Sequence, residues 1–196
     1  MNQQILQNIL DETNGAFRNY KKLAERAIEQ VSDEEFFVMI DAESNSLATI
    51  CKHVGGNLRS RWTDFLTSDG EKADRNRDAE FIAENDSRES ILQIWENGFQ
   101  TLLATLESLK PEDLGKIVQI RCEDFTVVKA INRSLAHTTS HVGQIQFLAK
   151  HLRASDWKTL SVPRNQSAEF TVWLKSKDDK GNYLEATEEY AKKDLK

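Results

Sequence analysis

Apolar residues recur at helical spacing in four long stretches of the chain, residues 5–31, 43–66, 87–109 and 125–152. Within each stretch the apolar positions return every three or four residues, which places them on one face of a helix. Pro111 follows the third stretch, where a helix is expected to end. Four amphipathic helices with long connections predict an all-α protein that folds as a four-helix bundle.

Two polar segments lie between these helices. Residues 67–86 form a long polar connection, which is either a solvated crossover or a functional loop that could close over a site. Residues 117–121 are β-like and predict a short edge ribbon. We therefore expect the helices to carry the core, and both interpretations of the connection stay open.

The C-terminal part of the chain differs in character from the four stretches. We expect an extended segment at 157–164, a short helix at 167–175 and a loosely ordered charged end over 177–196. The predicted organisation is one domain, with the bundle in residues 1–166 and a short C-terminal extension, a helix and charged tail, in residues 167–196.

Two histidines stand one helical turn apart in the fourth stretch. His137 and His141 therefore project from the same face of the helix, beside the apolar face. Gln144 continues that face one turn further on. In the second stretch, His53 precedes an apolar position in the same way as His141 does. Two packed helices could thus place three histidines on one rim of their shared core.

Three converging imidazoles form a ligand set for a divalent metal ion, which binds each nitrogen at about 2 Å. A set of three histidines with no fourth protein ligand leaves positions for water or substrate, as in catalytic sites. From the spacing alone, a metal site and ordinary polar histidines at the rim of the core are equally good interpretations. His151 lies roughly 15 Å along the helix from His141, at about 1.5 Å per residue, so we assign it to the surface.

The second stretch carries further candidate residues. Asn57 lies one turn from His53, as Gln144 does from His141, and both could orient ligands or a bound water.

Arg59, Arg61 and Trp62 are candidates to line a substrate site or to bind an acidic group. A packed, salt-bridged helix end would explain these three residues equally well. Gly55 and Gly56 either allow close approach of another helix or a ligand, or are a tolerated weak point that costs about 1 kcal/mol per residue.

Composition narrows the class of protein. The chain has 196 residues and a formal net charge of −6, and no basic stripe interleaved with aromatic residues, so we expect no nucleic-acid partner and no role in DNA repair. No apolar run approaches the ~20 residues of a membrane span, and the chain begins without a signal-peptide pattern. We expect a cytoplasmic protein with no membrane partner.

The sequence offers little evidence for other kinds of site. The two cysteines are far apart and predict no disulfide framework; Cys51 is interpreted as a small buried apolar residue, and Cys122 lies in a connection. The chain contains no P-loop, dinucleotide fingerprint or HExxH motif.

The histidines and their neighbours resemble a known family. Three segments carry the resemblance: Lys52-His53-Val54-Gly55-Gly56-Asn57, residues 59–67, and His137-xxx-His141-Val142-Gly143-Gln144-Ile145. The chain is similar to the DinB/YfiT-like superfamily of proposed metal-dependent enzymes, in particular to a bacterial subgroup of unknown function. The resemblance covers residues 6–166 and implies an up-down-down-up four-helix bundle. It also implies a homodimer with zinc or nickel on His53, His137 and His141.

Three hypotheses for the function remain, and the first follows from the resemblance. Characterised relatives include S-transferases and isomerases that use low-molecular-weight thiols such as bacillithiol or mycothiol. The first hypothesis is therefore a metal-dependent thiol S-transferase or hydrolase that acts on a small-molecule substrate. The second is a metal-binding or stress-response module without turnover. A third is a helical scaffold in which the histidines only form hydrogen bonds.

Overall fold

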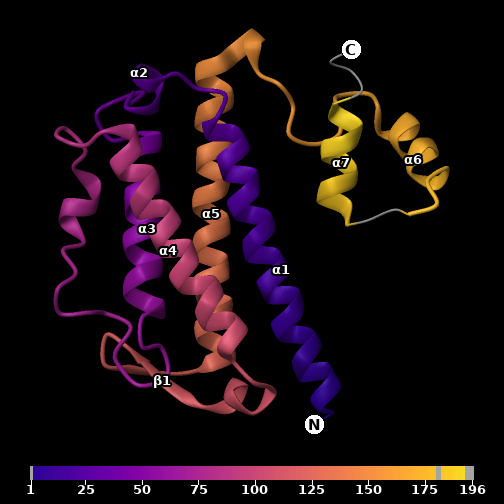
Figure 1. The fold of residues 1–196 in the computed structure, drawn as a ribbon. Helices are drawn as coiled ribbons and strands as arrows, with labels where there is room; N and C mark the ends of the chain where they lie inside the picture. Colours follow the sequence, from indigo (N-terminus) through magenta and orange to yellow (C-terminus); the bar gives the residue numbers. More distant parts are fainter. Residues whose placement is uncertain (1, 180–181, 193–196) are drawn as a thin grey trace. The chain divides into compact units, whose positions relative to one another are not determined.

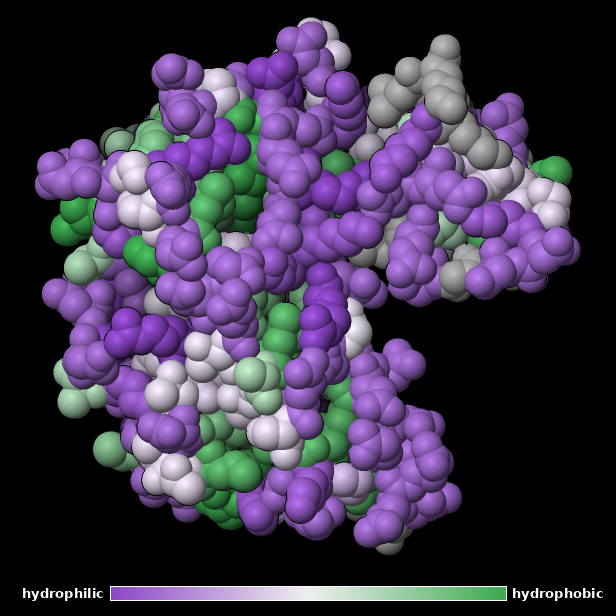
Figure 2. Space-filling view, viewed as in Figure 1, coloured by the Kyte–Doolittle hydropathy of each residue, from purple (hydrophilic) through white to green (hydrophobic). Residues whose placement is uncertain are grey.

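The computed structural model describes residues 2–179 and 182–192, and the described chain is mostly helical (Figure 1). It forms two compact units, Met1–Leu152 and Arg153–Lys196. No described helix is both long and apolar enough to cross a membrane. On the face drawn in Figure 2, hydrophilic residues predominate and hydrophobic residues show between them in separate areas.

The first unit contains the four predicted helices, joined by shorter elements. The long helices are α1 (Gln3–Ile28), α3 (Leu47–Trp62), α4 (Arg88–Ser108) and α5 (Val127–Arg153). The shorter elements are α2 (Asp33–Phe36), η1 (Asp78–Phe81), η2 (Pro111–Gly115), β1 (Ile117–Ile120) and β2 (Glu123–Thr126).

Local capping explains why two helix boundaries differ from those predicted. The second helix begins at Leu47, not near residue 43, because the Ser46 hydroxyl accepts the Thr49 N–H at 3.2 Å. It ends at Trp62 because Thr63 is extended and Asp64 has a positive φ of 47°. The predicted helix ends are therefore trimmed by a few residues.

The core of the first unit gathers around Trp62, which is 1 % exposed. Its ring lies edge-on to Phe17 of α1, with centroids 6.3 Å apart, and stacks on Phe65 at 4.6 Å. Its indole N–H donates to Ser134 of α5 at 3.1 Å. Three of the long helices therefore meet at one side chain.

Helices α3 and α4 cross at a pair of glycines. A Cβ atom on Gly55 would lie 2.5 Å from the backbone oxygen of Ile94, and one on Gly98 would collide with the backbone of Gly55. Only glycine allows this approach, since 3.4 Å is the lower end of ordinary contact. A Cβ on Gly56 would instead lie 2.5 Å from the Glu80 carboxylate. Gly55 thus allows the close packing of α3 against α4, and Gly56 leaves room for the buried Glu80 carboxylate.

The predicted edge ribbon is one strand of an antiparallel hairpin, in which Ile117 pairs with Thr126 and Ile120 with Glu123. Because β2 occupies residues 123–126, the fourth helix begins at Val127 and not at residue 125. The connection before α4 is attached to this hairpin, since the Gly70 N–H donates to the Gln119 carbonyl at 2.8 Å.

The second unit has more helix than expected. α6 (Ser167–Lys175) matches the predicted short helix, but the predicted loosely ordered end also contains α7 (Tyr183–Ala191). Ala186 and Tyr190 lie one turn apart on α7 and form a buried cluster with Phe170, which is why the charged segment is helical there. Residues 180, 181 and 193–196 of that segment lie outside the described residues. The predicted domain organisation stays a prediction.

Candidate metal centre

Helices α3 and α5 bring three histidines together. His53 of α3 is buried, and His137 and His141 of α5 are half-buried. One ligand nitrogen from each ring lies within 4.8 Å of the others. The ring centroids are 5.2 Å apart for His53 and His137, 5.0 Å for His53 and His141, and 4.6 Å for the two histidines of α5. The three residues are positioned to bind a metal ion.

One pair of histidine nitrogens has a separation that fits two ligands of one ion. Nε2 of His53 lies 3.2 Å from Nε2 of His137. Two nitrogens bound tetrahedrally at about 2.05 Å would lie about 3.3 Å apart. His151, the fourth histidine, is exposed further along α5, as predicted.

A buried carboxylate orients His53. Nδ1 of His53 lies 2.8 Å from Oε2 of Glu80, which is 7 % exposed, so Nδ1 carries the proton and Nε2 presents its lone pair to the other histidines. Arg75 donates to both Glu80 oxygens, from Nε at 2.8 Å and from a terminal nitrogen at 2.9 Å. Burial would raise the pKa of Glu80, but these hydrogen bonds outweigh it and hold the pKa below its ordinary value. Glu80 is therefore an ionised carboxylate that fixes the ring.

The two histidines of α5 are held as neutral imidazoles. Burial lowers the pKa of His137 to about 3, and the nearby His141 and His53 add to this effect. Burial also lowers the pKa of His141, against the opposing effect of its hydrogen bond to Gln144. Nδ1 of His141 lies 2.8 Å from the Gln144 amide oxygen, which leaves Nε2 with a free lone pair. Neutral imidazole is the form that binds metal ions.

His137 contains a buried polar atom without a partner. Its Nδ1 forms no hydrogen bond with the described residues. Leaving such a group unpaired costs roughly 1–3 kcal/mol. A metal ion on Nε2 would not relieve this cost, so the unpaired Nδ1 does not separate the metal interpretation from that of ordinary rim histidines.

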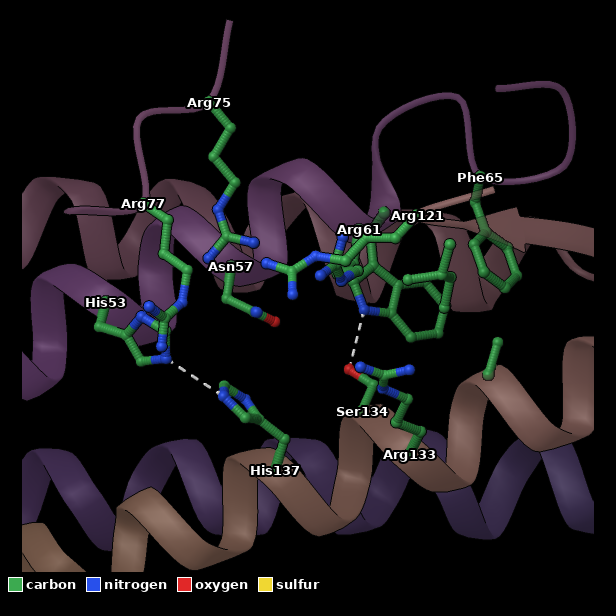
Figure 3. A pocket seen from close by; sticks show the side chains of 13 residues that line it. His53, Asn57, Arg61, Phe65, Arg75, Arg77, Arg121, Arg133, Ser134 and His137 are labelled. Carbon is green, nitrogen blue, oxygen red and sulfur yellow. Dashed lines mark hydrogen bonds between the residues drawn. The ribbon is translucent and has the colours of Figure 1, made fainter. Parts of the chain in front are cut away.

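A cavity of about 200 Å³ opens beside the cluster, and His53 and His137 form part of its wall (Figure 3). Trp62 and Phe65 line an apolar side of the cavity, and Asn57 contributes an amide. Phe81 stacks on His53 with ring centroids 4.7 Å apart, so it covers the face of that ring. Two of the three histidines thus face a small cavity.

The structure brings most of the predicted site residues to this region. Asn57, Arg61 and Trp62 line the cavity, and Gln144 contacts His141. Arg59 is not brought there: it is exposed, outside that lining, and forms an ion pair with Asp74 at 2.8 Å.

The sequence reasoning missed Glu80 and Arg75, both in the polar connection 67–86. Glu80 is buried although it is acidic, because Arg75 neutralises its charge and the Nδ1 proton of His53 donates to it. Phe81, the one aromatic residue of that connection, was a signal that part of it packs inward.

The fold and the site define a helical protein with three histidines positioned for one metal ion. Residues 4–166 match the family described as "Protein of unknown function (DUF1572)", and the chain belongs to this family. No curated protein and no solved structure matches the chain. The resemblance to the DinB/YfiT-like superfamily stays a hypothesis.

Proposed function

We propose that this protein is a divalent-metal-dependent enzyme in which His53, His137 and His141 hold zinc or nickel. The observation that carries the proposal is that the histidine cluster shares a wall with the cavity. A site that only stores or senses a metal has no need of an adjoining volume for a second molecule. Three nitrogen donors without a fourth protein ligand also leave coordination positions for water or substrate.

The surrounding residues have separable roles in this proposal. Glu80 and Gln144 fix the ring orientations of His53 and His141, and Arg75 keeps Glu80 ionised. Phe81 shields His53 from water. Such partners of metal ligands change metal affinity by about 10–100-fold when they are mutated.

We propose a low-molecular-weight thiol or water as the nucleophile and a small electrophilic molecule as its substrate. A divalent ion held by the three histidines would supply Lewis acidity, which lowers the pKa of a bound thiol and brings that of bound water to about 7. The apolar wall of Trp62 and Phe65 and the amide of Asn57 would hold the substrate beside the histidines. The alternative, a metal-binding module without turnover, uses the same three ligands.

Metal content tests whether the three histidines bind a metal ion. Elemental analysis of protein purified without an affinity tag should find about one zinc or nickel per chain in the wild type and in His151→Ala, and little in His137→Ala. His151 is the matched control because it is an exposed histidine on the same helix. Equal metal in all three proteins, or none after reconstitution, would refute the assignment.

Turnover separates an enzyme from a metal-binding module. Transfer of thiols to electrophiles, and hydrolysis of activated esters and amides, should be measured with and without a chelator. Activity that disappears with chelation and in His137→Ala supports the enzyme. Stoichiometric metal without turnover in either screen would favour the module.

We further infer that α1, α3, α4 and α5 form an up-down-down-up bundle. The course of the ribbon in Figure 1 supports this inference. A homodimer, a cytoplasmic location and the absence of a nucleic-acid partner also remain predictions. Size-exclusion chromatography with light scattering would test the dimer.

A further inference from the structure

The cavity beside the histidines is strongly basic. Of the described residues that line it, five are arginines and none is a carboxylate; the arginines are Arg61, Arg75, Arg77, Arg121 and Arg133. They come from α3, the connection before α4, the hairpin turn and α5. Figure 3 shows Arg61, Arg75 and Arg77 extending toward one space from one side, with Arg133 of α5 on the other. The chain has a formal charge of −6, so its overall composition does not explain why five arginines gather around one cavity.

Two carboxylates behind the wall neutralise only part of this charge. Oε2 of Glu71 lies 2.7 Å from Arg61, 3.3 Å from Arg75 and 3.1 Å from Arg121. Glu80 accepts from Arg75 on the side facing His53. Five guanidinium groups against two carboxylates leave an excess of three positive charges around the cavity.

Arg77 and Arg133, whose side chains are exposed, carry two of these three charges. Neither forms an ion pair within the part of the chain that the structure describes. Each lies over an aromatic ring: Arg77 is 5.1 Å from the centroid of Phe81, and Arg133 is 5.3 Å from that of Phe125. Such stacking holds the guanidinium plane but leaves its N–H groups free, and these match carboxylate and phosphate oxygens in pairs.

Neutral donors face the same cavity. Ser134 is 8 % exposed, and its oxygen accepts from Trp62, so its own proton has no acceptor among the described residues. A buried hydroxyl with an unused donor next to a basic cavity is suited to an anionic oxygen. The side-chain amide of Asn57 also has no partner in the described part of the chain.

The hairpin turn that carries Arg121 has an unusual backbone. Arg121 and Cys122 have φ values of 57° and 62°, a conformation that hairpin turns usually give to asparagine and glycine. Both backbone N–H groups donate to the carboxylate of Asp69, at 2.8 and 2.7 Å, which stabilises the turn. The chain therefore holds an arginine at the cavity where the backbone would favour a smaller residue.

From these observations we propose that the molecule bound beside the histidines carries a carboxylate or phosphate group. This group binds between Arg77 and Arg133, accepts the Ser134 proton, and leaves the rest of the molecule directed toward His53 and His137. That the bound molecule is a substrate rests on the proposed function. The binding of the anion itself requires only the arginines and Ser134.

The test is calorimetric titration of the chelator-treated, metal-free protein with inorganic phosphate and, separately, with succinate, at constant ionic strength. Saturable binding of at least one anion is expected, and the tighter one identifies the group. Arg77→Gln and Arg133→Gln should each weaken binding about ten- to hundredfold, the usual range for losing charged hydrogen bonds. Arg133→Lys keeps the charge without the paired donors and should lie between the wild type and Arg133→Gln.

Arg59→Gln is the matched control, because Arg59 is exposed and lies outside the cavity. It should bind the anions within twofold of the wild type. No saturable binding of either anion, or equal loss in Arg59→Gln and Arg77→Gln, would overturn the inference. Because the protein is metal-free in this experiment, failure here is distinct from failure of the metal assignment. Anion binding in a protein that never takes up metal would refute only the proposed function.

Discussion

Replacing Gly55 by alanine tests the close crossing of α3 and α4. The new Cβ would lie 2.5 Å from the Ile94 oxygen, 2.7 Å from its carbonyl carbon and 2.8 Å from the Trp95 nitrogen. All three are backbone atoms of α4, so no side chain can move aside, and the helices must separate by about 1 Å to restore ordinary contact.

The expected cost follows from two opposing effects. Overpacking against a rigid neighbour costs about 3 kcal/mol, the upper end of the usual range, because the contacts are with backbone. Alanine is favoured over glycine in a helix by about 1 kcal/mol. The net loss is about 2 kcal/mol in the free energy of unfolding, which lowers Tm by about 4–8 °C in a chain of this size.

Thermal unfolding followed by circular dichroism measures the effect. Gly15→Ala is the matched control, since Gly15 is also in a long helix but nothing lies within 4 Å of its ideal Cβ. That variant should keep or raise Tm by about 2 °C, from a gain of about 0.5–1 kcal/mol. A Tm for Gly55→Ala equal to or above the wild type would refute the close crossing.

Three further predictions concern the site and the cysteines. Glu80→Gln should weaken metal affinity by about 10–100-fold in competition with a chelator, because it removes the charge that orients His53; unchanged affinity would contradict that role. Burial holds the pKa of His137 at about 3, below its ordinary 6.5, so below about pH 6.5 the unfolded chain binds a proton that the folded chain does not. Urea unfolding of the metal-free protein should therefore show stability falling from pH 7.5 to pH 5, and less steeply in His137→Asn; equal slopes would contradict this. Cys51 is fully buried, and burial raises the pKa of its thiol, so a thiol reagent should label the exposed Cys122 alone in the native protein. Mass spectrometry showing native labelling of Cys51 would count against the packing of α3.

The sequence by itself determined the helices and the histidine face. Helical periodicity is a local property, so the four long helices could be placed to within a few residues, with their ends shifted by caps such as Ser46. His137 and His141 share a face because they are one turn apart on a helix. The matching position of each histidine beside an apolar face allowed a site shared with His53, and the structure brings the three together. The same pattern could not show that α7 forms in the charged end, because its packing against Phe170 depends on a short, separate cluster.

Only the tertiary structure decided what surrounds the histidines. Glu80, Arg75 and Arg77 lie in a connection without periodicity, so their side-chain directions depend on how that segment attaches to the hairpin and to His53. Arg59 and Arg61 are two residues apart on the same helix, yet one is exposed against Asp74 and the other lines the cavity. The helical period separates their directions but does not say which one faces the neighbouring segments. Burial of a charge depends on distant partners that neutralise it, and those partners are brought near only by folding.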